Sequence, residues 1–397
     1  MYRSQFMPQA DAIGTLRFFP ESGTTIVDGG NGEWLRTGLA KTTSGYPTAS
    51  ALENLKVSGL VGAFGASVTV VSIATDGNGV FVACQNASTS LYISTNGGLT
   101  WQTANSNLAG SLNAVSVAFG GGKFVCVGNS ASAISYSYAT AANIVSSPTT
   151  AWTQVSQTTI GGGTGTANSV KIAYGGGKFV AIAGSSGTTG AIGYSTTGTS
   201  FTAANTSQAL TNASWPVYSA SKWLIGSPNG TTGTTSTDGI TWSNATLPVN
   251  INGSFTGSAS TFLVNARYTS TDGSTWVDRG IFPGFSGYPL STSFQNSAVY
   301  DGTRFIIGTT GLPAVWWSTD GIDWKLRWLS TTPTTSHIVC ASNNKLLVVP
   351  TVAGSACYYS TNFTVADYVG TGKTIWSAAN GVVSINAESA IAYVRIK

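Results

Sequence analysis

The residues that most often carry catalysis are scarce in this chain of 397 residues. It contains one histidine, His337, so neither a serine–histidine–aspartate triad nor a histidine-rich metal site can be assembled. Residues 370–374 read GTGKT, which resembles the end of a phosphate-binding loop, but the earlier glycine is missing and a strand-like run follows. We therefore predict no catalytic residue, no metal ion and no cofactor.

The cysteines also give no sign of metal or redox chemistry. Cys84, Cys126, Cys340 and Cys357 lie in or beside apolar, strand-like runs and show no C-x-x-C spacing. This placement favours buried free thiols over disulfides or a metal site.

Aspartate recurs at a fixed place in a short repeat. The clear copies are STNGGLTW (residues 94–101), STDGITW (236–242), STDGSTW (270–276) and STDGIDW (318–324), and eroded copies occupy residues 195–201 and 360–368. The aspartate or asparagine is placed to cap its own turn, the glycine supplies a left-handed conformation, and the tryptophan anchors the next strand. No second aspartate stands two residues away, as a calcium loop requires. Structural roles are therefore predicted for Ser94, Asn96, Trp101, Asp238, Trp242, Asp272, Trp276, Asp320 and Trp324.

A second recurring segment precedes these turns and shows which elements position them. It reads AFGGGKFVCVG (residues 118–128), AYGGGKFVAIAG (173–184) and VYDGTRFIIG (299–308), with looser copies at 217–226 and 340–349. Each repeat then holds four short strand-like runs, and Asp-Gly or Asn-Gly between the last two suits a tight hairpin. Because the closing aromatic residues recur every 34 to 51 residues, we predict an all-β fold, a β-propeller of four-stranded antiparallel blades, with essentially no helix in residues 67–397.

The S-x-D-G-x-T-W copies resemble the Asp-box (BNR) repeat of sialidase-like propellers, and residues 94–101 have its full eight-residue spacing. Together with GGGKFVAIAG, they look like the propeller repeats of bacteriophage tail and other virion proteins. The resemblance covers roughly residues 67–397. It implies a structural turn on the face opposite the usual ligand site, and it implies a tail or other virion protein.

The number of blades depends on how the ring closes. The last residues, 375–397, supply three strand-like runs and lack a fourth, whereas residues 24–38 carry an Asp-Gly turn followed by Trp34. Pairing residues 24–38 with the C-terminal runs would remove two exposed strand edges. We therefore expect eight blades, with seven as the alternative. The expected domains are an N-terminal attachment arm (residues 1–60), whose LRFFP stretch docks on a partner, and the propeller (residues 61–397).

Sialidase chemistry is a specific alternative because the Asp-box resemblance implies it. That family binds a carboxylate with three arginines and activates a tyrosine with a glutamate. The repeats contain Arg267, Arg279, Arg304 and Arg327, but Glu388 is their one glutamate, and the FRIP-type motif is absent. The better candidate for recognition is the aromatic-rich connection at residues 279–290, which presents Phe282, Phe285 and Tyr288 for sugar or protein contact.

Charged residues make up 8% of the chain, and the net charge of +4 is spread without a basic cluster. This favours neither nucleic acid nor insertion into a membrane. The first residues lack the apolar core of a signal peptide, so we expect synthesis in the host cytoplasm. The predicted function is a non-enzymatic virion structural protein, a phage tail, tail-fibre or baseplate-associated propeller on the virion's external surface. It would contact other virion proteins through its arm and a host glycan or protein through its loops. The alternative is a carbohydrate-binding or sialidase-like propeller.

Overall fold

The computed structural model describes residues 16–20, 34–41, 56–58, 70–85, 88–106, 108, 114–130, 133–155, 170–183, 191–204, 215–227, 230–251, 255–280, 298–308, 314–328, 337–342, 345–350, 357–360 and 390–395. The chain divides into two units by its internal contacts: residues 53–364 form one, and residues 1–52 with 365–397 form the other.

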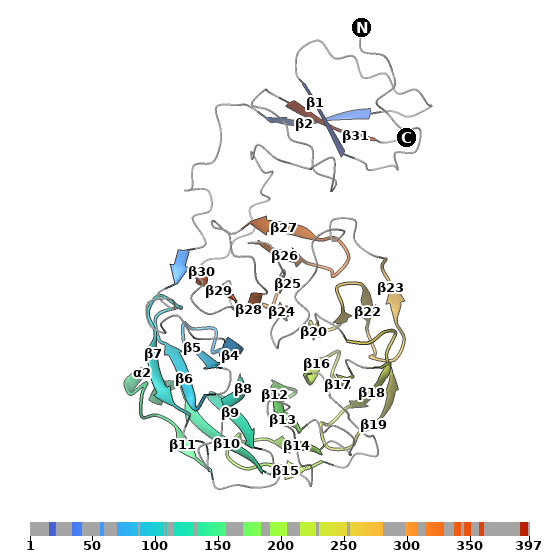
Figure 1. Cartoon of the computed structure of the whole chain (residues 1–397). Coiled ribbons are helices and arrows are strands. Elements are labelled where there is room, and N and C mark those ends of the chain that lie inside the picture. Colours follow the sequence, from blue (N-terminus) through green and yellow to red (C-terminus); the bar gives the residue numbers. More distant parts are fainter. Residues whose placement is uncertain are drawn as a thin grey trace. The chain divides into compact units, whose positions relative to one another are not determined.

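Six blades are each built from four strands that follow one another along the chain (Figure 1). Their strands are β4 (Val70–Thr75), β5 (Phe81–Gln85), β6 (Ser90–Ser94) and β7 (Gln102–Asn105); β8 (Ala114–Gly120), β9 (Lys123–Ser130), β10 (Ala133–Thr140) and β11 (Thr153–Gln154); β12 (Val170–Gly175), β13 (Lys178–Ala183), β14 (Ala191–Ser195) and β15 (Thr202–Ala203). The next three blades are β16 (Val217–Ser219), β17 (Lys222–Gly226), β18 (Thr232–Ser236) and β19 (Ser243–Thr246); β20 (Phe255–Gly257), β21 (Phe262–Val264), β22 (Tyr268–Ser270) and β23 (Val277–Asp278); β24 (Ala298–Tyr300), β25 (Phe305–Gly308), β26 (Ala314–Ser318) and β27 (Lys325–Trp328).

A composite sheet completes the ring. Strands β28 (His337–Ser342), β29 (Lys345–Pro350) and β30 (Cys357–Ser360) are joined by β3 (Lys56–Ser58), which precedes the first blade in the sequence. The first strand of each blade lies innermost, and these strands contact one another in order, with β28 contacting β4 (Figure 1). The strand β3 therefore covers the free edge of β30 and ties the end of the ring to its beginning.

The expected counts of eight and seven blades are both wrong: the described residues form six blades of four consecutive strands. The expected closing segment, residues 24–38, is also wrong. Strand β2 (Trp34–Lys41) pairs with β31 (Ala390–Arg395), which pairs in turn with β1 (Leu16–Pro20), in a separate three-stranded sheet. The N-terminal and C-terminal runs do pair with each other, but they form a sheet of their own and not part of a blade. The boundary expected at residue 60 accordingly differs from the observed units, since β3 belongs with the ring and β31 with β1 and β2.

The prediction of four-stranded antiparallel blades is confirmed, and among the described residues one helix interrupts the strand order. Helix α2 (Ala141–Ser146) lies between β10 and β11, where the repeat is stretched by insertion. The Thr140 side chain caps it by accepting from the Asn143 N–H, and Ile144 anchors it in the core.

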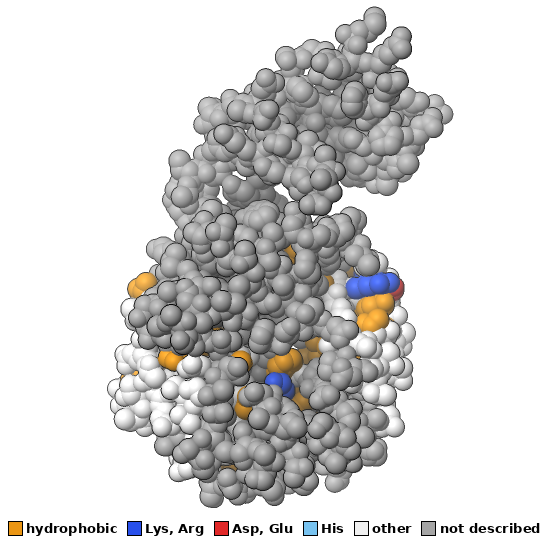
Figure 2. Space-filling model, viewed as in Figure 1, with side chains coloured by type: hydrophobic (Ala, Val, Ile, Leu, Met, Phe, Trp, Pro, Cys, Tyr) orange, Lys and Arg blue, Asp and Glu red, His pale blue; other side chains and the backbone are white. Residues whose placement is uncertain are grey.

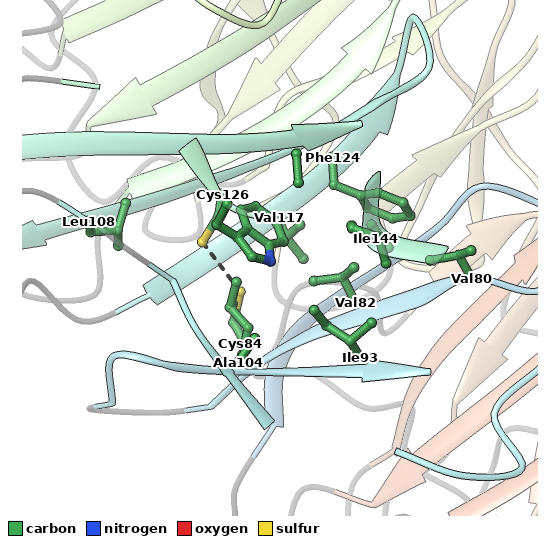
Figure 3. Packing of buried hydrophobic residues seen from close by; sticks show 14 residues of the cluster. Val80, Val82, Cys84, Ile93, Ala104, Leu108, Val117, Phe124, Cys126 and Ile144 are labelled. Carbon is green, nitrogen blue, oxygen red and sulfur yellow. Dashed lines mark hydrogen bonds between the residues drawn. The ribbon is translucent and has the colours of Figure 1, made fainter. Parts of the chain in front are cut away.

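The core consists of layers of apolar side chains between neighbouring blades. The second strand of a blade is the most buried, because it is paired on both edges and covered on both faces: Phe81, Val82, Ala83 and Cys84 of β5 are all 0% exposed. Figure 3 shows one such layer, in which β5 and β6 of the first blade face β8 and β9 of the second. Cys84 and Cys126 meet there with their sulfur atoms 4.0 Å apart. Both are buried free thiols, as predicted for them.

Candidate functional site

The antiparallel topology gives the ring two distinct ends. We call the end that carries the connections from first to second and from third to fourth strand the turn end. The opposite end carries the connections from second to third strand and from blade to blade, and we call it the loop end. The repeated glycine turns and the S-T-[DN]-G turns all lie at the turn end.

Short hydrogen-bond networks stabilise the turn end, and each network lies within a single turn. In the turn at residues 270–276, the Ser270 hydroxyl donates to Asp272 Oδ1 (2.9 Å) and accepts from the Gly273 N–H (2.8 Å). Asp272 Oδ1 also accepts from the N–H groups of Ser274 and Thr275 at 2.7 and 2.6 Å. The turns around Asp238 and Asp320 repeat this network with donor–acceptor distances of 2.8 to 2.9 Å.

Asn96 performs the same task in the first blade. Its side-chain oxygen accepts from the Thr100 N–H (2.9 Å), and Ser94 Oγ accepts from the Gly98 N–H (2.9 Å). Gly97 and Gly98 have φ of 80° and 94°, so the extra residue of this copy is accommodated by a second glycine in a conformation that other residues avoid.

These hydrogen bonds hold the aspartates in their charged form. Backbone N–H donors lower the pKa of Asp238 (from Thr241, then Ile240) and of Asp272 (from Thr275, then Ser274). Burial works to raise the pKa of Asp320, but the N–H groups of Ile322 and Asp323 outweigh it and the pKa is lowered. Because the carboxylate oxygens already accept from their own turns, the geometry gives these residues a structural task. Among the described residues, no three side chains of His, Cys, Asp or Glu gather as metal ligands.

The tryptophans that close these turns differ in burial. Trp101, Trp242 and Trp324 are buried, at 7%, 4% and 4% exposure, whereas Trp276 is partly exposed. The indole N–H of Trp101 donates to the Gly98 carbonyl (3.0 Å) and that of Trp242 to the Gly239 carbonyl (3.3 Å). In these two copies, the indole therefore stabilises the turn by a hydrogen bond and also fills space between blades.

The arginines that sialidase chemistry would need are held apart. Arg304 lies at the turn end and forms a buried ion pair with Asp301, with Nη2 2.7 Å from Oδ2. Arg267 lies at the loop end, where its Nε donates to Asp278 Oδ1 (2.7 Å) and this contact lowers the pKa of Asp278 to about 2. Arg279 Nε donates to the Thr269 hydroxyl. Each guanidinium is thus used within its own blade, and these three do not converge on one carboxylate site. Glu388 and the side chain of Arg327 lie outside the described residues.

The predicted recognition residues Phe282, Phe285 and Tyr288 also lie outside the described residues. The connection that carries them runs from β23 to β24, so the topology assigns it to the loop end. Of its neighbours, Val277 is exposed (46%), and the Arg267 guanidinium lies over the Tyr268 ring, 4.9 Å from its centre.

One contact, between Lys171 of β12 and Trp215 just before β16, was missed by the sequence analysis. The Lys171 ammonium lies 4.5 Å from the centre of the Trp215 ring, and burial lowers the lysine pKa to about 8. Figure 2 shows one face of the chain, on which few charged side chains are visible among the described residues. The available signal was the innermost strand VKIAYG, which carries a lysine where VSIAT and VSVAF carry serine.

Comparison with solved structures agrees with the architecture. The chain is similar to YCF48 bound to D1 peptide (15% identity, TM-score 0.53, covering 77% of this chain and 96% of that one). It is also similar to an inactive virginiamycin B lyase from Staphylococcus aureus in complex with quinupristin (10% identity, TM-score 0.56, 77% and 98%) and to the WD40 repeats of RRP9 (10%, 0.50, 78% and 97%).

These likenesses show a β-propeller fold, which is the class of protein that this chain represents. No family model matches the chain, and no curated protein sequence matches it. In the described residues, no helix is long and apolar enough to span a membrane.

Proposed function

We propose that the chain is a non-enzymatic structural protein of a virion, a phage tail, tail-fibre or baseplate-associated propeller that takes part in attachment. Its turns at residues 94–101, 236–242, 270–276 and 318–324 are assigned to the Asp-box (BNR) type. The separate sheet of β1, β2 and β31 belongs to the attachment unit that contacts other virion proteins. The connections at the loop end, including Phe282, Phe285 and Tyr288, contact a host glycan or protein.

The proposal rests on one observation: the charged side chains of the repeats bind partners within their own turns and blades. Asp238, Asp272 and Asp320 cap their own turns, and Arg267 and Arg304 pair with aspartates of their own blades. The repeated polar side chains thereby stabilise the ring, which leaves recognition to the connections between blades. A rigid ring that presents variable loops suits attachment, since little conformational entropy is lost on binding.

The alternative is a carbohydrate-binding or sialidase-like propeller. Release of sugar from an oligosaccharide would distinguish a sialidase-like enzyme from the proposed non-enzymatic protein. The full chain is incubated with intact bacterial cells and with an array of sialylated and other oligosaccharides. Retained protein and released sugars are both measured. We expect saturable retention on cells and no released sugar. Sugar release at a rate proportional to protein concentration contradicts the non-enzymatic role.

A variant pair tests the loop. The triple change Phe282→Ala, Phe285→Ala and Tyr288→Ala is compared with the control Leu99→Ala with Ile322→Ala, which removes apolar side chains exposed at the turn end (46% and 39%). The loop variant should lose retention while its melting temperature is unchanged, and the control should keep retention. Equal retention by both variants contradicts the role of the loop.

A further inference from the structure

Two of the chain's four cysteines meet between the first and second blades. Cys84 lies on β5 and Cys126 on β9, 42 positions apart in the sequence, and their sulfur atoms are 4.0 Å apart (Figure 3). Both are free thiols, both are 0% exposed, and both belong to one apolar cluster. The sulfur atoms of a disulfide are about 2.0 Å apart, so a bond needs an approach of about 2 Å between side chains that already touch.

The corresponding places in the next two pairs of blades hold aliphatic side chains. Cys84 is the third residue after Phe81 in β5, and Cys126 is the second residue after the phenylalanine of β9. In the following pairs of blades, the residues at these two positions lie together in apolar clusters: Val127 with Ala181, and Ile182 with Ile225. Packing of the blades therefore needs no thiol here. The first pair of blades departs from this rule on both of its sides, and such a departure is typical of a functional position.

A bond between these sulfur atoms would join two blades covalently, because β5 and β9 belong to different sheets. The first blade is also where the ring closes, since its innermost strand, β4, contacts β28. A crosslink between distant positions of the sequence restricts the unfolded chain and thereby stabilises the folded one. The crosslink would therefore stabilise the ring next to the place where its end meets its beginning.

We propose that Cys84 and Cys126 form an oxidative modification site, at which a peroxide converts the two thiols into a disulfide that joins the first blade to the second. One sulfur, as the thiolate, attacks a peroxide oxygen. The O–O bond breaks, a sulfenic acid forms, and the other oxygen leaves as water with the thiol proton. The second sulfur then attacks the sulfenic sulfur, so the S–S bond forms, the S–O bond breaks and a second water leaves. The thiols lose two electrons, and hydrogen peroxide is reduced to two molecules of water.

Burial makes this reaction slow in the folded chain. Burial, and then the contact with Cys126, raise the pKa of the Cys84 thiol, so the reactive thiolate is scarce. Cys84 precedes Gln85, the half-buried last residue of β5 at the loop end, so a local opening of the blades at that end is enough for a peroxide to reach it. The thiols therefore persist in a reducing cytoplasm and are oxidised outside it. This site is independent of the virion assignment, because it follows from the packing of two blades alone.

The experiment uses the full chain, purified under reductant and then incubated with hydrogen peroxide well below its melting temperature. Free thiols are blocked with an alkylating agent, and the unreduced peptides are mapped by mass spectrometry. We expect a peptide pair linked through Cys84 and Cys126, and a melting temperature several degrees above that of the reduced chain. Dithiothreitol should reverse both changes.

Variants assign these changes to the pair. Cys84→Val and Cys126→Ala each introduce the residue found at that position in the next pair of blades, so both variants should fold. Each should lose the linked peptide and the peroxide-dependent gain in melting temperature. The control, Cys340→Ala with Cys357→Ala, removes the other two cysteines and should keep both. Absence of the linked peptide from the oxidised chain, oxidation to sulfinic or sulfonic acid in its place, or an equal gain in Cys84→Val and Cys126→Ala overturns the proposal.

Discussion

Asp238, Asp272 and Asp320 each accept hydrogen bonds from backbone N–H groups, and this makes their charge a source of stability. Their pKa values are lowered in the folded chain, so they stabilise it above the unfolded pKa of about 3.9, and that contribution is lost as pH falls through the folded values. Asn96 shows that an amide oxygen can replace the carboxylate.

The triple change Asp238→Asn, Asp272→Asn and Asp320→Asn is therefore expected to fold. Its melting temperature should fall less than that of the unmodified chain between pH 5 and pH 3, because the capping oxygens no longer titrate. Thermal denaturation at each pH measures this. The change Asp323→Asn, at an exposed carboxylate that does not cap a turn, is the control. If all three proteins lose the same number of degrees, the carboxylates are not the titrating caps.

The closing tryptophans should not be equivalent. Trp242 is 4% exposed and its indole N–H donates to the Gly239 carbonyl, so Trp242→Ala should cost about 3–5 kcal/mol through the cavity it leaves. Trp276→Ala should cost clearly less, because that ring is partly exposed and its N–H has no partner among the described residues. Urea unfolding of both variants measures the two losses in stability. A larger loss for Trp276→Ala would show that burial does not determine how much each tryptophan stabilises the chain.

At the scale of elements, glycine permits the close approach of neighbouring blades. A Cβ on Gly120, at the end of β8, would lie 2.0 to 2.3 Å from three ring atoms of Tyr174 on β12. Gly120 does not have a positive φ, so the conflict is purely steric. We expect Gly120→Ala to destabilise the chain by about 1–3 kcal/mol.

A double change separates sterics from other causes. In a Tyr174→Ala background the ring is gone, so adding Gly120→Ala should cost little, and the two changes should be strongly non-additive. Urea denaturation of the two single variants and the double variant measures the coupling. Additive losses would mean that the glycine is needed for another reason.

The strands and turns were predictable because they depend on local residues. Alternating apolar runs, Gly-Gly-Lys hairpins and the repeated Ser-Thr-Asp-Gly turns predict blades without knowledge of the neighbours. Ring closure was not predictable in this way. Residues 24–38 carry a better turn-and-tryptophan signal than residues 56–58, which read KVS, but a strand edge accepts any backbone of suitable reach. The pair Lys171 and Trp215 was missed because it joins two blades and appears only when the strand registers are aligned.

At the scale of the whole molecule, ring closure by β3 makes a prediction about truncation. Residues 53–364 form one unit that retains β3, so this fragment should fold with a cooperative thermal transition. Residues 61–364 lack β3 and leave the edge of β30 unpaired, which should lower the melting temperature and promote aggregation. Circular dichroism and light scattering distinguish the fragments. If the two behave identically, β3 does not close the ring.

The role as a structural component of a virion is the central claim, and the composition of purified particles tests it most directly. Particles are separated from the lysate of producing cells on a density gradient, and their proteins are quantified by mass spectrometry. The account predicts that the chain moves with the particles at a fixed ratio to the major structural proteins and stays with them after a high-salt wash. Recovery of the chain only in the soluble fraction, or its loss in that wash, would contradict the claim.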